Sequence, residues 1–201
     1  NFGLNLNLQN TNLNQFLKQN ENFKTEGKFN SVWKIKKTPT DYSLNGILSS
    51  SELYVNKFLV GKLNLNISGN TQLNLFTIDL NILNNDKNTF SGVGNFILDN
   101  KSSKLDLDIN FSEFDISFLS ALGKKSISNI HGFLDGNVNI WGEISNLQNT
   151  GLLGLSNSGF SIPYLNTDYS LSNETQINLY NNLLEFTPTD LIDHIYNTKA
   201  S

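Results

Sequence analysis

Apolar and polar residues alternate with a period of two along most of this chain. Residues 63–67 read Leu-Asn-Leu-Asn-Ile, and residues 105–111 read Leu-Asp-Leu-Asp-Ile-Asn-Phe. Residues 2–8, 138–140 and 177–179 follow the same pattern. Successive side chains of a β-strand point to opposite faces of its sheet, so each segment would have one apolar face and one polar face. The pattern therefore predicts an all-β protein.

Clusters of turn-forming residues separate the alternating segments and indicate how the strands connect. Asn, Asp, Gly, Ser and Pro supply the backbone conformations that tight turns need. We expect about a dozen strands, joined mostly by short hairpins into an antiparallel meander. The parity of the alternation switches once, at Leu75–Phe76, which predicts a β-bulge. The expected turns or bulges lie at 37–41, 45–46, 69–70, 84–88, 99–103 and 158–159.

Two segments break the alternation and have apolar residues at helical spacing. They are Thr11 to Lys18 and Asp115 to Leu122, the second followed by Gly123, a helix-terminating residue. Both are expected to be short amphipathic helices of about two turns. Helices of that length are too short to cover a sheet of a dozen strands.

Composition excludes several classes of function. The net charge is −4, and the basic residues are 14 lysines with no arginine and no basic stripe, so nucleic-acid binding is not expected. The absence of cysteine excludes disulfides and thiol chemistry and fits either the cytosol or the periplasm. Asparagine makes up about a sixth of the chain, which with the missing arginine is typical of an AT-rich genome.

No residue pattern of a catalytic, metal or cofactor site is present. His131 and His194 are the only histidines, and a metal site needs three or four ligands. Asp106 and Asp108 lie two residues apart and would share the polar face of one strand, where solvation is expected rather than acid–base chemistry. Neither a nucleophile elbow nor a phosphate-binding loop occurs. We therefore expect no enzyme activity, no metal and no cofactor.

A sheet with one apolar face must cover that face. A second sheet, a closed barrel or bound lipid could do so, and the pattern alone leaves these alternatives open. Among these we expect the sheet to curve into an open, taco-like trough with an apolar interior, whose lining would hold lipid or another client. The residues expected to line it are Leu63, Leu65, Ile67, Leu105, Leu107, Ile109, Phe111, Val138, Ile140, Leu153, Leu155, Phe160 and Ile162.

The second half of the chain resembles the C-terminal region of TamB-like translocation and assembly module proteins, of the AsmA/TamB superfamily, especially the Bacteroidetes type. The resemblance covers residues 105–195 and rests mainly on glycine spacing. It includes Asp-Ile-Ser-Phe-Leu at 115–119, a match to the family's short helix, and later the Tyr-Leu-x-Thr-x-Tyr strand at 164–169. Between them the matching positions are Ile130, Gly132, Gly136, Gly142, Gly151, Leu153, Leu155, Asn157, Gly159 and Phe160. The family's next strand, which ends near an acidic residue, is matched by Phe186 to Asp193. Pro163 and Trp141 depart from the family's pattern.

This resemblance implies a function for the trough. Members of the family are anchored in the inner membrane, cross the periplasm and are implicated in phospholipid transport to the outer membrane and in outer-membrane protein assembly. The implied partners are phospholipid acyl chains and a BamA- or TamA-like outer-membrane barrel protein. Residues 1–201 would be a single β-rich segment of a larger protein, on the periplasmic side.

Three other classes of protein remain as alternatives. An adhesin-like surface protein would have polar faces on both sides or a second covering sheet. A β-sandwich carbohydrate-binding module would present Trp33 and Trp141 coplanar on one exposed face. An outer-membrane barrel would have an even set of strands of about ten residues with aromatic girdles.

Overall fold

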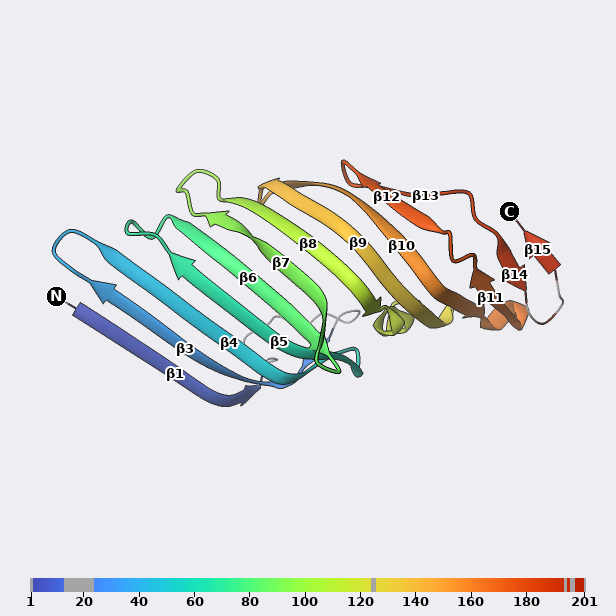
Figure 1. The fold of residues 1–201 in the computed structure, drawn as a ribbon, viewed down its shortest axis with the longest axis horizontal. Coiled ribbons are helices and arrows are strands. Elements are labelled where there is room, and N and C mark those ends of the chain that lie inside the picture. The colour runs from blue at the N-terminus through green and yellow to red at the C-terminus, as the bar shows by residue number, and fades with distance from the viewer. Residues whose placement is uncertain (1, 13–23, 124–125, 194, 196–197, 201) are drawn as a thin grey trace.

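A computed structural model of the chain describes residues 2–12, 24–123, 126–193, 195 and 198–200. Its strands form one 15-stranded antiparallel sheet, and two short 3₁₀ helices interrupt the chain (Figure 1). The strands are β1 (Phe2–Asn12), β2 (Thr25–Glu26), β3 (Lys28–Lys37), β4 (Tyr42–Val55), β5 (Phe58–Gly69), β6 (Leu75–Asn84), β7 (Lys87–Ile97), β8 (Lys104–Asp115), β9 (Ser128–Glu143), β10 (Asn146–Ile162), β11 (Thr167–Leu171), β12 (Gln176–Tyr180), β13 (Leu183–Phe186), β14 (Leu191–Asp193) and β15 (Thr198–Ala200). The 3₁₀ helices are η2 (Ser117–Ala121) and η3 (Pro163–Leu165).

The strand order confirms the predicted meander. From β3 to β10 every strand pairs with the next one in the sequence, and β1 extends the sheet beside β3. After β10 the sheet branches, because β11 and β12 both pair with β10. All described strands belong to this one sheet, so the described part of the chain has no second sheet to cover it.

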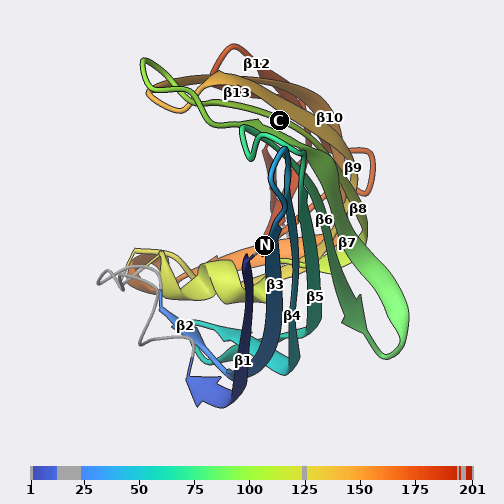
Figure 2. The same ribbon diagram turned by 90° about the vertical axis from the view of Figure 1, so that its left-hand side faces the viewer.

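The sheet is open, as expected for a trough, and its strands curve along their length. In the end view the strands bend into a C, and η2 lies inside the opening of the C (Figure 2). Helix η2 contacts both β5 and β9, which are separated by three intervening strands. One short element can reach both strands only because the sheet curls around it. The described chain is therefore a trough, and the face toward η2 is its inner face.

Asparagine supplies four of the six residues in three two-residue hairpin loops. In each loop both residues have a positive φ: Asn56 and Lys57, Asn85 and Asp86, and Asn181 and Asn182. That combination is typical of type I′ turns, whose twist matches the right-handed twist of the flanking strands. Asparagine tolerates positive φ better than most residues. Part of the unusual asparagine content thus has a structural role in the hairpins.

The expected turns at 37–41, 69–70, 84–88 and 99–103 are confirmed, since strands end or begin at each. The prediction of a turn or bulge at Asn45–Gly46 is wrong, because these residues lie within β4 and pair in regular register. The Leu75–Phe76 bulge is also wrong. Strand β6 begins at Leu75, so the parity switch marks the boundary with the preceding loop. At 158–159 a register shift in β10 confirms the predicted irregularity.

The two expected helices differ in outcome. The segment from Asp115 to Leu122 does contain a helix, but it is a single 3₁₀ segment, and Asp115 is still in β8. The Asp115 carboxylate accepts hydrogen bonds from the backbone amide of Ser117 at 2.8 Å and from its hydroxyl at 2.5 Å, which fixes the turn out of the strand. Of the other segment, Thr11 to Lys18, only Thr11 and Asn12 are described, and both belong to β1. Residues 13–18 lie outside the described part.

Ten apolar side chains are buried among the described residues. Nine of them form two clusters on the inner face around η2, and the tenth, Phe29 of β3, lies outside both clusters. The first includes Ile116, Val138, Leu153, Leu155 and Ile177. The second joins Val55 and Val60 at one hairpin to Ile82 and Phe114, so strands distant in the sheet meet across the trough. The core of the described chain is thus concentrated in the part of the trough that η2 covers.

The accessible surface is large for a chain of this size. It measures 12887 Å² for a mass of 22.5 kDa. A compact monomer of that mass would expose about 9,500 Å². The excess of about 3,400 Å² reflects a single-layer sheet with both faces accessible over much of its length. Folding of this chain therefore leaves much of its apolar face uncovered.

Two glycines of β7 make a matched test of the packing between strands. A Cβ added at Gly92 would meet its nearest neighbour, a ring atom of Phe90, at 3.6 Å, which is ordinary contact. A Cβ at Gly94 would lie 2.0 Å from the carbonyl oxygen of Asp106. We expect Gly92→Ala to stabilise the protein by about 0.5–1 kcal/mol and Gly94→Ala to destabilise it by about 1–3 kcal/mol. Urea unfolding would measure both changes, and equal effects would contradict the described register.

Candidate functional site

The inner face is apolar along almost the whole sheet. One row of cross-strand neighbours runs from Leu6 through Trp33, Gly46, Ile67, Ile78, Gly94 and Leu107 to Ile140. The next row runs from Leu8 through Ser31, Leu48, Leu65, Leu80, Gly92, Ile109 and Val138 to Gly151. Rows of this kind form because the alternation of every strand is in register with that of its neighbours.

All the residues predicted to line a trough lie on this inner face. Ten of the thirteen are at regular positions of β5, β8, β9 and β10. Leu155 belongs to the buried cluster, and Phe160 and Ile162 return to the inner side after the register shift in β10. Val138, Leu153 and Leu155 are buried within the cluster around η2, whereas Leu65, Ile67, Leu105 and Leu107 are only half-buried. Whether these side chains contact lipid stays a prediction.

One long edge of the trough is closed by aromatic packing. Phe114 lies near the C-terminal end of β8, just before η2. Measured between ring centroids, its ring lies 5.9 Å from Phe90, 5.5 Å from Phe111 and 6.1 Å from Phe118. Edge-to-face and tilted arrangements at these separations are favourable. Phe118 belongs to η2, so this stack fixes the helix over the strand ends near the β4–β5 and β6–β7 hairpins. The rings therefore fill the inner face at this edge.

Toward the opposite edge, the inner face contains a hollow of about 310 Å³ whose lining residues are all apolar. Ile67 and Ile78 are direct cross-strand neighbours in its floor, and Phe76 and Phe96 face each other with centroids 6.2 Å apart. The volume is at the lower end of the range for ligand pockets. Its lining is Trp33, Leu44, Ile67, Phe76, Ile78, Phe96 and Leu98. We call this hollow the apolar cavity.

Sequence reasoning identified only Ile67 among the residues of the apolar cavity. Phe96 escaped notice because glycines occupy the inner positions before it, at 92 and 94, and glycine is not counted in an apolar alternation. Trp33 was considered as a sugar-stacking residue. Its indole instead covers Gly46, where an added Cβ would lie 2.2 Å from the ring. A search for alternation that accepted glycine at inward positions could have identified Phe96 and its row.

The outer face is polar and carries networks of amide and carboxylate side chains. Asn139 donates hydrogen bonds to Asp106 at 3.2 Å and Asp108 at 2.9 Å, and Asn110 donates to Asn137 at 2.6 Å. Asp106 and Asp108 are exposed, as the sequence predicts for a solvated outer face. Within the described residues, no group of three or more His, Asp or Glu side chains could hold a metal ion.

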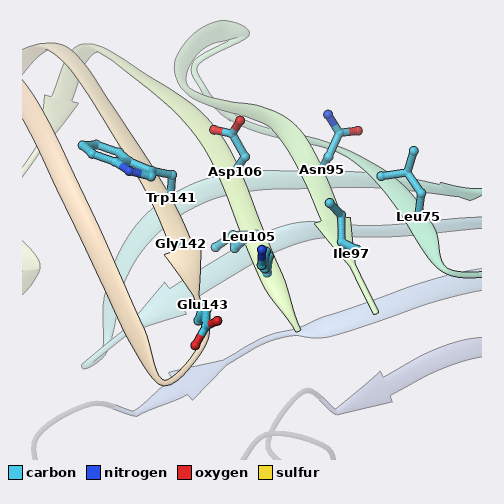
Figure 3. A pocket seen from close by; sticks show the side chains of 9 residues that line it. Leu75, Asn95, Ile97, Leu105, Asp106, Trp141, Gly142 and Glu143 are labelled. Atoms are coloured by element: carbon cyan, nitrogen blue, oxygen red, sulfur yellow. The ribbon is translucent and has the colours of Figure 1, made fainter. Parts of the chain in front are cut away.

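A second hollow, of about 490 Å³, lies on the outer face at the ends of β6 to β9 (Figure 3). Trp141, Asp106 and Asn95 contribute side chains from three neighbouring strands. Trp33 is on the inner face and Trp141 on the outer face, so the two rings cannot form one sugar-binding platform. The arrangement predicted for a carbohydrate-binding module is therefore wrong. Trp141 is the only aromatic residue among those lining this hollow.

The two histidines offer little chemistry. His131 is exposed, and its Nδ1 lies 2.9 Å from the carbonyl oxygen of Asn129. His194 lies outside the described residues.

No helix in the described ranges has the length and hydropathy needed to span a bilayer. Comparison of the chain with protein-family models, with curated proteins and with solved structures returned no match.

Proposed function

We propose that this chain is a section of a β-trough that conducts phospholipid acyl chains along its inner face. The proposal rests on one observation above all: among the residues that the structure describes, the apolar inner face is covered mainly where η2 packs. Soluble monomers rarely leave apolar patches of more than about 300–600 Å² exposed. A lipid tail is a suitable cover, because it is apolar, flexible and does not need hydrogen-bonding partners.

The expected energy of transfer is sufficient for binding. Each CH₂ group moved from water to an apolar surface gains about 0.8 kcal/mol. A chain of about sixteen carbons could therefore gain on the order of 10 kcal/mol before the entropy of ordering is subtracted. Half-buried leucines and isoleucines in continuous rows would let such a chain slide, since no polar group on the lining fixes its position.

As part of this proposal, the trough acts in the periplasm, in an envelope protein anchored in the inner membrane, and moves phospholipid to the outer membrane. Assembly of outer-membrane proteins with a BamA- or TamA-like barrel is a related role for the same surface, since an apolar strand could occupy it too. In this proposal the trough has no enzymatic activity. The support for this setting is the resemblance of residues 105–195 to TamB-like proteins.

The alternatives receive less support. An adhesin-like protein would bury or polarise the face that is apolar and uncovered here. A sandwich module needs two sheets, and the described strands form one. The strand order runs from β1 to β15 without these two pairing, so the described sheet is not closed as a barrel would be.

Lipid that co-purifies with the chain tests the proposal directly. We expect native mass spectrometry of protein purified without detergent to detect bound phospholipid. The signal of the lipid-bound protein should fall after a delipidating wash. It should return after incubation with vesicles. A protein that carries no lipid and takes up none from vesicles would exclude lipid conduction by this segment.

A further inference from the structure

The open edge of the trough ends in an amphipathic row above the apolar cavity. Lys37 and Tyr42 are cross-strand partners on the inner face at the ends of β3 and β4. The ammonium nitrogen of Lys37 lies 5.1 Å from the centroid of the Tyr42 ring. The Lys37 ammonium donates a side-chain hydrogen bond to the Tyr42 hydroxyl oxygen, and this bond, followed by the Coulombic interaction of the two groups, raises the pKa of Lys37. The last inner row is therefore cationic where the rows below it are apolar.

This row is close enough to the apolar cavity for one ligand to contact both. Leu44, in the cavity lining, is two residues from Tyr42 on the same face of β4, which corresponds to about 7 Å along the strand. The backbone amide of Tyr42 donates a 2.9 Å hydrogen bond to the carbonyl of Thr71. That bond holds the row against the loop between β5 and β6. A molecule with an apolar tail in the cavity would place its polar end at Lys37.

The local charge at this edge favours an anion. Lys37 is the cation on the inner face, whereas Lys34 and Lys36 lie on the outer face of β3. Asp41 is the only acidic residue between positions 27 and 51. Its carboxylate accepts a hydrogen bond from Thr40 at 2.8 Å. Lys37 forms no ion pair with any residue that the structure describes, so its charge remains available to a ligand on the inner face.

The other long edge does not offer the same arrangement. There η2 and the phenylalanine stack cover the inner face, and Lys87 is paired with Glu113 at 3.1 Å. An amphiphile whose tail lies in the apolar cavity would therefore place its polar end at the nearer edge, which carries Lys37.

We propose that Lys37 and Tyr42 bind the phosphate head group of an anionic phospholipid whose acyl chain occupies the apolar cavity. This inference rests on the proposed function and adds to it a fixed orientation and a preference for anionic lipid. The lining of the trough cannot discriminate between head groups, because it is apolar. Discrimination arises at the edge, where the phosphate meets Lys37.

The test compares phosphatidylglycerol with phosphatidylcholine of the same short acyl chains. Trp33 lines the apolar cavity, so its fluorescence in a Trp141→Phe background reports on occupancy. We expect phosphatidylglycerol to bind about three- to tenfold more tightly, the range for one charge-assisted contact at an exposed site. The preference should disappear in Lys37→Gln and at 1 M salt, where the screening length falls to about 3 Å. Lys104→Gln, an exposed lysine on the outer face near the same edge, is the matched control and should retain it.

Four results would overturn this inference. Equal binding of both lipids by the unaltered chain, or an undiminished preference in Lys37→Gln, would remove the head-group site while leaving lipid conduction in place. Equal loss in Lys37→Gln and Lys104→Gln would attribute the preference to overall charge. Failure of both lipids to bind would overturn the proposed function itself.

Discussion

Ile67→Glu is expected to weaken acyl-chain binding by at least about 100-fold, whereas Ile47→Glu should leave it within about twofold. Ile67 lies in the apolar cavity, and Ile47 is 56% exposed on the outer face of the neighbouring strand. In the empty trough a glutamate at 67 can remain hydrated. When a lipid tail fills the cavity, the carboxylate must lose its water without gaining a partner, and this desolvation opposes binding.

Quenching of Trp33 by a brominated fatty acid would measure this effect in both variants. The two substitutions introduce the same side chain and the same charge on adjacent strands, β5 and β4, so propensity and net charge cancel in the comparison. Circular dichroism should show that both variants keep the strand content of the unaltered chain. Similar affinities for Ile67→Glu and Ile47→Glu would mean that the acyl chain does not lie on the inner face.

Phe114→Ala is expected to lower the free energy of unfolding by about 3–5 kcal/mol. Phe114 is 8% exposed and contacts three other phenylalanine rings, including Phe118 of η2. Its removal would leave a cavity in the cluster that joins η2 to the strands. Since a domain of this kind is stable by about 5–15 kcal/mol, the substitution would remove a large part of its stability.

Phe2→Ala is the control for Phe114→Ala, because Phe2 is 62% exposed on β1. Its effect should stay within about 1 kcal/mol. Guanidinium unfolding followed by far-ultraviolet circular dichroism would measure both variants. If both lost the same small amount, the cluster around η2 would not stabilise the curved sheet, and the closed edge of the trough would have to depend on other contacts.

The strands and most hairpins could be predicted because their causes are local. Alternation within residues 63–67 or 105–111 decides which side chains share a face, and asparagine-rich loops such as that at Asn85 decide where the chain reverses. The errors arose where one local pattern had two readings. Asn45–Gly46 has the composition of a hairpin turn, yet Gly46 is needed in β4 because the indole of Trp33 lies over it.

The candidate site was predicted in part, because the sequence assigns residues to a face but does not assign them to depths. Val138 and Leu107 belong to the same kind of alternating strand, yet one is buried under η2 and the other is half-buried on the inner face. Likewise, nothing local to Lys37 indicates that its ammonium group stands over Tyr42 at the edge of a cavity. These differences depend on which strands lie beside one another and on where η2 packs.

The sequence by itself determined the secondary structure class, the meander and the two-sided character of every strand, since each follows from residues within about ten positions of one another. Only the tertiary structure decided that the sheet stays open, which edge η2 closes and where the apolar cavity forms. The physical reason is that the curvature of the sheet depends on the twist of many strands together. In addition, the cluster in which Phe118 packs with Val55 and Val60 joins residues some sixty positions apart. Contacts at that separation leave no periodic signature in the chain.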